Sequence, residues 1–195
     1  MGAVGVSHDD EPGLFSAVPE LELVRALLAD LHDDLRGKVS RFNQLTELSQ
    51  ALGADGTLLP GGETAYAAWL EARTSFIHGN YIATVMLCQS LAEHMLAGQL
   101  VAFGRQGLPE RVSFHETLSR CVAQGYVGET DAADLRRLMS LRNPLSHYRD
   151  INDSSNLSRR ALNSREPVQE HLMRDASFAI SMAVRLLALP SFRLG

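Results

Sequence analysis

The sequence YIATVMLCQSLAEHMLAGQLVAF, residues 81–103, decides the fold. Apolar side chains such as Val85 and Leu91 lie on nearly every side of a helix built from it, and a helix that is apolar all round is a buried one. We therefore expect a helix over Tyr81–Phe103 at the centre of a bundle. The pair Gly79-Asn80 before it is typical of the turn that ends a preceding helix.

Glu93 is the single acidic residue of this segment. A carboxylate among apolar neighbours needs water or a partner, because burying an unpaired charge costs much free energy. Two interpretations stay open. Either Glu93 lies with Gln89 on a narrow solvated stripe, or it is buried against a cation.

Apolar residues recur at three- and four-residue steps over most of the chain from Pro19 on, which is the spacing of amphipathic helices. No segment alternates with a period of two. The pattern predicts an all-α bundle of five to six main helices. In chain order we expect helices over 19–48 with a bend at Gly37, 63–78, 81–103, 113–125 behind a capping box of Ser113 and Glu116, 130–142 capped by Thr130, and 167–189 opened by Pro167, with a polar loop from Asn152 as far as Glu166.

Length and composition fit one soluble domain: the chain has 195 residues, of which 45% are hydrophobic and 21% charged. We expect a loosely held tail over residues 1–18 and one bundle domain over 19–195. Cys88 and Cys121 both lie in apolar helical contexts and are expected to be buried free thiols of a reducing compartment. Neither end carries a targeting signal, and the most apolar run near the C-terminus contains Arg185, so we expect a cytoplasmic protein that does not enter a membrane.

Charge is distributed unevenly along the chain. The net charge is −5, which argues against a general nucleic-acid coat. Residues 1–34 hold eight acids and one arginine, whereas residues 141–165 hold five arginines and two aspartates. The positive charge therefore gathers late in the chain, although a solvated loop is the commoner cause of such a cluster.

Several common kinds of catalytic site are excluded by their missing motifs. The sequence has no Walker-type phosphate loop, no H-E-x-x-H, no C-x-x-C and no G-x-S-x-G. Most of its seven histidines are scattered and are expected to be surface or structural residues. We predict neither a metal nor a cofactor.

The stretch LRNPLSHYRD, residues 141–150, breaks the helical pattern. Pro144 lacks an N–H and disfavours helical geometry at Asn143. We expect a helix to stop near Arg142, with Asn143 as its cap and Pro144 starting a new turn, so that Arg142 and His147 can face one pocket. A permanent cation beside a side chain of the kind that titrates near neutrality suits phosphate chemistry.

With this motif late in an all-α chain, the sequence resembles the HEPN superfamily, the helical domains of prokaryotic toxins, abortive-infection proteins and CRISPR-associated ribonucleases. Its signature is R-x4–6-H, often with Asn, Asp or His directly after the arginine, and LRNPLSHY fits it. The segment YIATVMLCQSLAEHML is similar to the family's apolar helix beside the motif. The resemblance covers roughly residues 20–190, but only the motif is specific.

The resemblance implies a metal-independent endoribonuclease of the toxin or defence type. It would be a homodimer in which both motifs meet at the interface, with RNA as substrate and an antitoxin protein as a further partner. His147 would act as general acid and base, Arg142 would hold the scissile phosphate, and Asn143 would orient one of them. The products would be a 2′,3′-cyclic phosphate and a 5′-hydroxyl. Candidate substrate-binding residues are Arg149, Arg159 and Arg160, with Glu93 as a candidate supporting carboxylate.

Two alternatives remain. Many HEPN domains are non-catalytic modules that bind a nucleotide, RNA or a protein partner. The motif is also compatible with a purely structural role, with Arg142 paired to a buried acid such as Glu93 and His147 at a helix end. In family toxins paired with nucleotidyltransferase antitoxins a tyrosine follows the histidine after one spacer; here Tyr148 is adjacent, so the regulation by tyrosine modification is not carried over.

Overall fold

The computed structural model describes residues 20–104 and 107–194. Across these residues the chain forms eight α-helices and two short 3-10 helices, with no strand. The predicted fold class, an all-α bundle, is confirmed, with slightly more helices than expected. The elements are α1 (Glu20–His32), α2 (Leu35–Ser49), η1 (Gln50–Leu52), α3 (Gly62–His78), α4 (Tyr81–Phe103), α5 (Phe114–Ala123), α6 (Glu129–Ser146), α7 (Leu157–Ser164), α8 (Val168–Ala188) and η2 (Pro190–Phe192).

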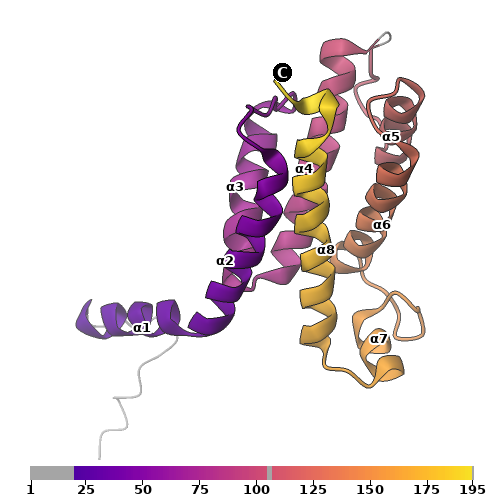
Figure 1. Ribbon diagram of the computed structural model, residues 1–195. Coiled ribbons are helices and arrows are strands. Elements are labelled where there is room, and N and C mark those ends of the chain that lie inside the picture. Colours follow the sequence, from indigo (N-terminus) through magenta and orange to yellow (C-terminus); the bar gives the residue numbers. More distant parts are fainter. Residues whose placement is uncertain (1–19, 105–106, 195) are drawn as a thin grey trace, which may run out of the picture. The chain divides into compact units, whose positions relative to one another are not determined.

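The central position predicted for Tyr81–Phe103 is confirmed. This helix, α4, packs against α3, α5, α6 and α8 (Figure 1). Val85, Cys88 and Leu91 are fully buried on it. Because each of these side chains is removed from water, their apolar area drives the packing of the surrounding helices.

Two glycines let the start of α3 approach α4 closely. A Cβ built on Gly98 of α4 would lie 2.2 Å from the carbonyl oxygen of Pro60, and one built on Gly61 would lie 2.7 Å from the carbonyl carbon of His94. Real Cβ atoms do not make such contacts with backbone, so larger residues at either position would push the two segments apart.

The first predicted helix is two helices. We expected a bend at Gly37, but the break lies at residues 33–34, where Asp34 has a left-handed φ of 49°, and Gly37 lies inside α2. Aspartate tolerates this conformation better than most residues, which explains why the chain turns there. The prediction of a bend at Gly37 was therefore wrong.

Contacts divide the chain into two units, Met1–Leu35 and Arg36–Gly195. The first contributes α1, with Leu21, Val24 and Leu28 along one side of the helix. The second contains the rest of α2 and all later helices. The tail expected over residues 1–18 lies outside the described residues.

The observed N-caps show which helix starts the sequence predicted correctly. Ser113 caps α5 as predicted, its Oγ accepting a hydrogen bond from the Glu116 N–H at 3.2 Å. Thr130 does not cap α6: Gly128 occupies the N-cap position and Thr130 lies in the first turn. The loop expected as far as Glu166 contains a further helix, α7.

Both cysteines are free and buried, as predicted. Burial raises the pKa of the Cys121 thiol to about 12 and that of Cys88 further still. No described helix is long and apolar enough to cross a membrane.

Candidate functional site

Helix α6 carries Arg142, Asn143 and the residues up to Ser146. Its buried side chains, among them Leu135 and Leu138, hold it against the core. His147 directly follows the last helical residue and has extended backbone, with φ −130° and ψ 138°. The motif therefore lies at a helix end that the core holds in place.

The expected helix end near Arg142 was wrong, because α6 continues through Pro144 to Ser146. Pro144 removes the N–H that would bond to the carbonyl four residues earlier. Other bonds hold this last turn: the His147 N–H donates to the Asn143 carbonyl at 3.1 Å, and the Ser146 hydroxyl donates to the same carbonyl at 3.2 Å. The proline is tolerated because it stands within the final turn.

The two motif residues differ in backbone conformation, because Arg142 is helical and His147 is extended. Arg142 is half-buried and His147 is exposed. Within the described part of the chain neither side chain makes a hydrogen bond or an ion pair, and the Asn143 amide makes none either. Arg142 is not paired with Glu93.

Glu93 lies away from the motif. It is exposed and accepts a hydrogen bond from the Gln89 amide at 3.2 Å, which favours a solvated position over burial against a cation. Gln89 itself is buried, so the expectation that it shares a solvated stripe with Glu93 was wrong. Glu93 lines a hollow of about 190 Å³ with residues that include Phe114 and Thr117 of the α5 region.

Hydrogen bonds order the segment after His147. The Asn156 amide donates to the Arg149 carbonyl at 2.8 Å, and its oxygen accepts from the Arg159 N–H at 3.1 Å, which caps α7. Asp153 accepts from the Ser155 N–H at 2.8 Å and the Ser155 hydroxyl at 2.7 Å. These bonds, with a smaller effect from the Arg149 charge, hold the pKa of Asp153 below its ordinary range.

The three candidate substrate-binding arginines have different surroundings. Arg149 lies 4.0 Å from Asp153, measured from Nε to Oδ2, and this Nε has no hydrogen-bond partner among the described residues. The half-buried side chain of Arg159 makes no hydrogen bond or ion pair within the described chain. Arg149 is therefore paired with Asp153, whereas Arg159 has no partner among the described residues.

Arg160 instead joins α7 to α8. Its two terminal nitrogens donate to the Asp175 carboxylate at 2.6 and 2.9 Å, and the Asp175 side chain is only 7% exposed. The paired carboxylate raises the pKa of Arg160. At the end of α7, the Ser164 hydroxyl lies 2.8 Å from Nε2 of the buried His171. The ion pair with Asp175 therefore gives Arg160 a structural role in attaching α7 to α8.

No family model, no curated protein and no solved structure matches this chain. Among the described residues no three His, Cys, Asp or Glu side chains gather in a way that could hold a metal ion.

Sequence reasoning missed the helix that presents Arg159. The signal was present: Asn156 stands three residues before Arg159, at the spacing of an N-cap and the N–H that it binds. Leu157 and Ala161 then follow at helical spacing. The run of polar residues before Asn156 concealed this short pattern.

Proposed function

We propose that the chain is a metal-independent endoribonuclease of the HEPN type, acting in defence or as a toxin. One observation carries the proposal: an arginine and a histidine five residues apart, at the end of one helix, have side chains without any partner in the described chain. A half-buried guanidinium normally finds a partner, and Arg142 has none among the described residues. A guanidinium and an imidazole left free beside a structured loop are suited to bind and cleave a phosphodiester.

In the proposed reaction His147 takes the proton of the RNA 2′-hydroxyl or delivers one to the leaving 5′-oxygen. The 2′-oxygen forms a bond to phosphorus as the bond to the 5′-oxygen breaks, which leaves a 2′,3′-cyclic phosphate and a 5′-hydroxyl. Arg142 binds the non-bridging oxygens, where charge develops in the transition state. The amide of Asn143 orients the phosphate. Arg149 and Arg159 contact neighbouring phosphates.

The unpaired motif residues support a site completed by a second copy. Arg142 and His147 make no hydrogen bond or ion pair with each other or with any other described residue. In a homodimer with twofold symmetry, the two copies contact one another through the same surface patch. Two motifs at such an interface could bring the arginine of one copy to the histidine of its partner.

The same unpaired side chains favour a second candidate, a non-catalytic module that binds RNA, a nucleotide or a protein partner. In that case Arg142 and Arg159, which have no partner among the described residues, bind an anion and His147 performs no proton transfer. An antitoxin encoded with the chain would be one such partner.

The products distinguish the two candidates. Incubation with RNA in EDTA should give fragments ending in a 2′,3′-cyclic phosphate, detected by mass spectrometry. A single 2′-deoxy nucleotide at a mapped cleavage position should abolish the cut there, because it removes the attacking oxygen. Fragments with a 3′-hydroxyl, or undiminished cutting at the deoxy position, would contradict the mechanism.

A further inference from the structure

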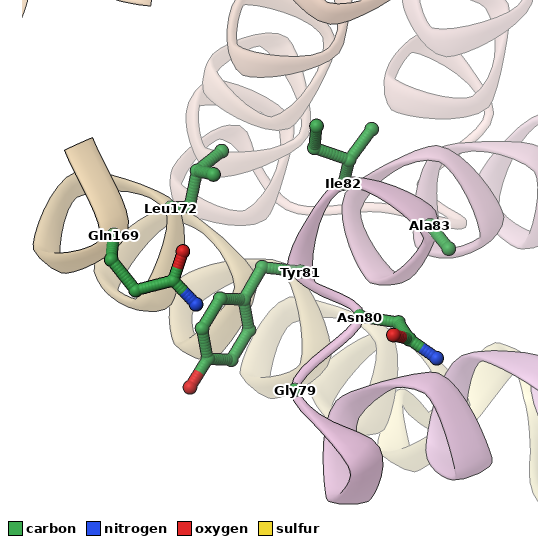
Figure 2. A pocket seen from close by; sticks show the side chains of 7 residues that line it. All are labelled: Gly79, Asn80, Tyr81, Ile82, Ala83, Gln169 and Leu172. Carbon is green, nitrogen blue, oxygen red and sulfur yellow. The ribbon is translucent and has the colours of Figure 1, made fainter. Parts of the chain in front are cut away.

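A hollow of about 520 Å³ lies between the first turn of α4 and the first turn of α8 (Figure 2). Residues 79–83 form one wall, and Gln169 and Leu172 form the other. In Figure 2 the Gln169 amide lies alongside the Tyr81 ring, while Ile82 and Leu172 project to the same side. A hollow of this volume falls within the range of small-molecule sites.

The lining combines apolar surface with a free amide. Ile82 is 47% exposed, although it lies beside the nearly buried Leu172. The Gln169 side chain makes no hydrogen bond within the described chain. Such an amide can donate and accept at once, so a flat ring with a donor next to an acceptor would satisfy both of its atoms. Adenine presents this pattern to glutamine at N6–H and N7. Uracil also presents it, at N3–H and O4, so adenine is favoured by the larger apolar area of its two rings against Ile82 and Leu172.

The electrostatics favour a ligand that also carries negative charge. The first turn of α4, which carries the positive end of that helix's dipole and no acidic residue, borders the hollow, whereas Glu170 in the first turn of α8 offsets the dipole there. Behind it lies the buried guanidinium of Arg41, whose Nη1 donates to the Tyr81 hydroxyl at 3.3 Å. A Cβ added at Gly79 would lie 3.3 Å from Nη2 of the same arginine, so the cation lies directly behind this wall.

The hollow and the motif lie at the same end of the bundle. Figure 1 shows the α3–α4 turn, the end of α6 and the start of α8 at this end. We propose that the hollow binds an adenylate unit, with adenine against Ile82 and Leu172, its edge read by Gln169, and its phosphate toward the start of α4. Resting on the proposed function, the adenylate belongs to the RNA substrate and gives the nuclease a preference for adenine near the cut.

The test is a titration followed by NMR of the backbone and side-chain amides, using the His147→Ala protein. The three ligands are AMP, UMP and a 2′-O-methyl hexaadenylate, which lacks the attacking hydroxyl and cannot be cut. AMP should shift the signals of residues 79–83 and of the Gln169 amide, and UMP should bind about tenfold more weakly. The hexaadenylate should bind at the same place more tightly than AMP, because its further phosphates meet the arginines.

Gln169→Ala should weaken AMP binding about tenfold. Gln50→Ala, which removes an exposed glutamine in η1, should leave the affinity unchanged. Shifts absent from residues 79–83 at millimolar AMP, equal affinity for UMP, or no effect of Gln169→Ala would each overturn the adenylate site. Binding of AMP without the hexaadenylate would overturn its assignment to the RNA strand and identify a free nucleotide as the ligand.

Because none of these ligands is cleaved, the result does not depend on catalysis. If the protein binds adenylate but leaves RNA intact, the adenylate site is supported and the nuclease proposal is contradicted. If it cuts RNA but no ligand binds in the hollow, the nuclease proposal is supported and the adenylate site is contradicted.

Discussion

Asp153 shows how single side chains fix the loop beside the motif. Its carboxylate accepts two hydrogen bonds from Ser155, and these hold its pKa below the ordinary value of 3.8. Because folding lowers the pKa of Asp153, its charged carboxylate stabilises the loop fully at pH values above the ordinary pKa. That stabilisation is lost as the pH falls through the lowered pKa of the folded state.

Ser155→Ala should move the pKa of Asp153 back toward its ordinary value, since the Ser155 hydroxyl is the largest cause of the shift. The measurement is an NMR titration of the Asp153 carboxyl carbon. Ser154→Ala, which alters the preceding residue, serves as the control and should leave the midpoint where it is. An equal effect of the two variants would contradict the assigned hydrogen bond.

Gly98 tests the close approach of α3 and α4. Alanine would gain about 1 kcal/mol of helix propensity, but its Cβ would lie 2.2 Å from the Pro60 oxygen, a backbone atom that cannot turn away. Gly98→Ala should therefore lower the free energy of unfolding by about 1–3 kcal/mol, measured by denaturant titration. Gly107→Ala adds a Cβ with nothing within 4 Å and should change it little. A stabilised Gly98→Ala protein would show that the two segments can separate freely.

At the level of elements, periodicity predicted the long helices and missed the short or broken ones. Tyr81–Phe103 was predicted to the residue, because a long apolar run leaves few alternatives. The break at Asp34 depends on one left-handed backbone angle, which sequence does not reveal. The continuation of α6 past Pro144 depends on hydrogen bonds in its last turn, so propensity alone gave the wrong end.

The sequence predicted the positions of the candidate site residues only in part. The motif pointed to Arg142, Asn143 and His147, but charge alone could not separate Arg159 from its neighbour Arg160. Only the packed α7–α8 pair shows that Asp175 binds the second of them. The hollow near Gln169 lies between the starts of α4 and α8, which are far apart in sequence. No local sequence pattern predicts that these two helix starts lie side by side.

The Arg160–Asp175 pair should carry much of the attachment of α7 to α8. Arg160→Ala leaves a nearly buried carboxylate without its two hydrogen bonds and should cost about 3 kcal/mol of unfolding free energy. Arg159→Ala, the neighbouring change, should cost less than about 0.5 kcal/mol. In a double-mutant cycle, Arg160→Ala with Asp175→Ala should cost clearly less than the sum of the single changes. Additive losses would contradict the coupling.

At the scale of the whole molecule, the proposed nuclease acts as a dimer of two copies of the chain. Arg142→Ala and His147→Ala proteins should each be inactive, but a mixture allowed to exchange subunits should recover about a quarter of the wild-type activity if each site takes its arginine and histidine from different copies. Half of the dimers would then be mixed, each with one intact site. No recovery would mean that each site needs both residues from one copy, and a monomer in light scattering would remove the shared site altogether.

The most direct measurement is RNA cleavage in EDTA by three proteins: wild type, His147→Ala and His115→Ala. His115 is an exposed histidine of α5 and provides the matched control. Loss of a general acid–base should reduce the cleavage rate at least about a hundredfold in His147→Ala, with His115→Ala equal to wild type. RNA left intact by the wild-type protein, or cut equally well by His147→Ala, would contradict the proposed nuclease.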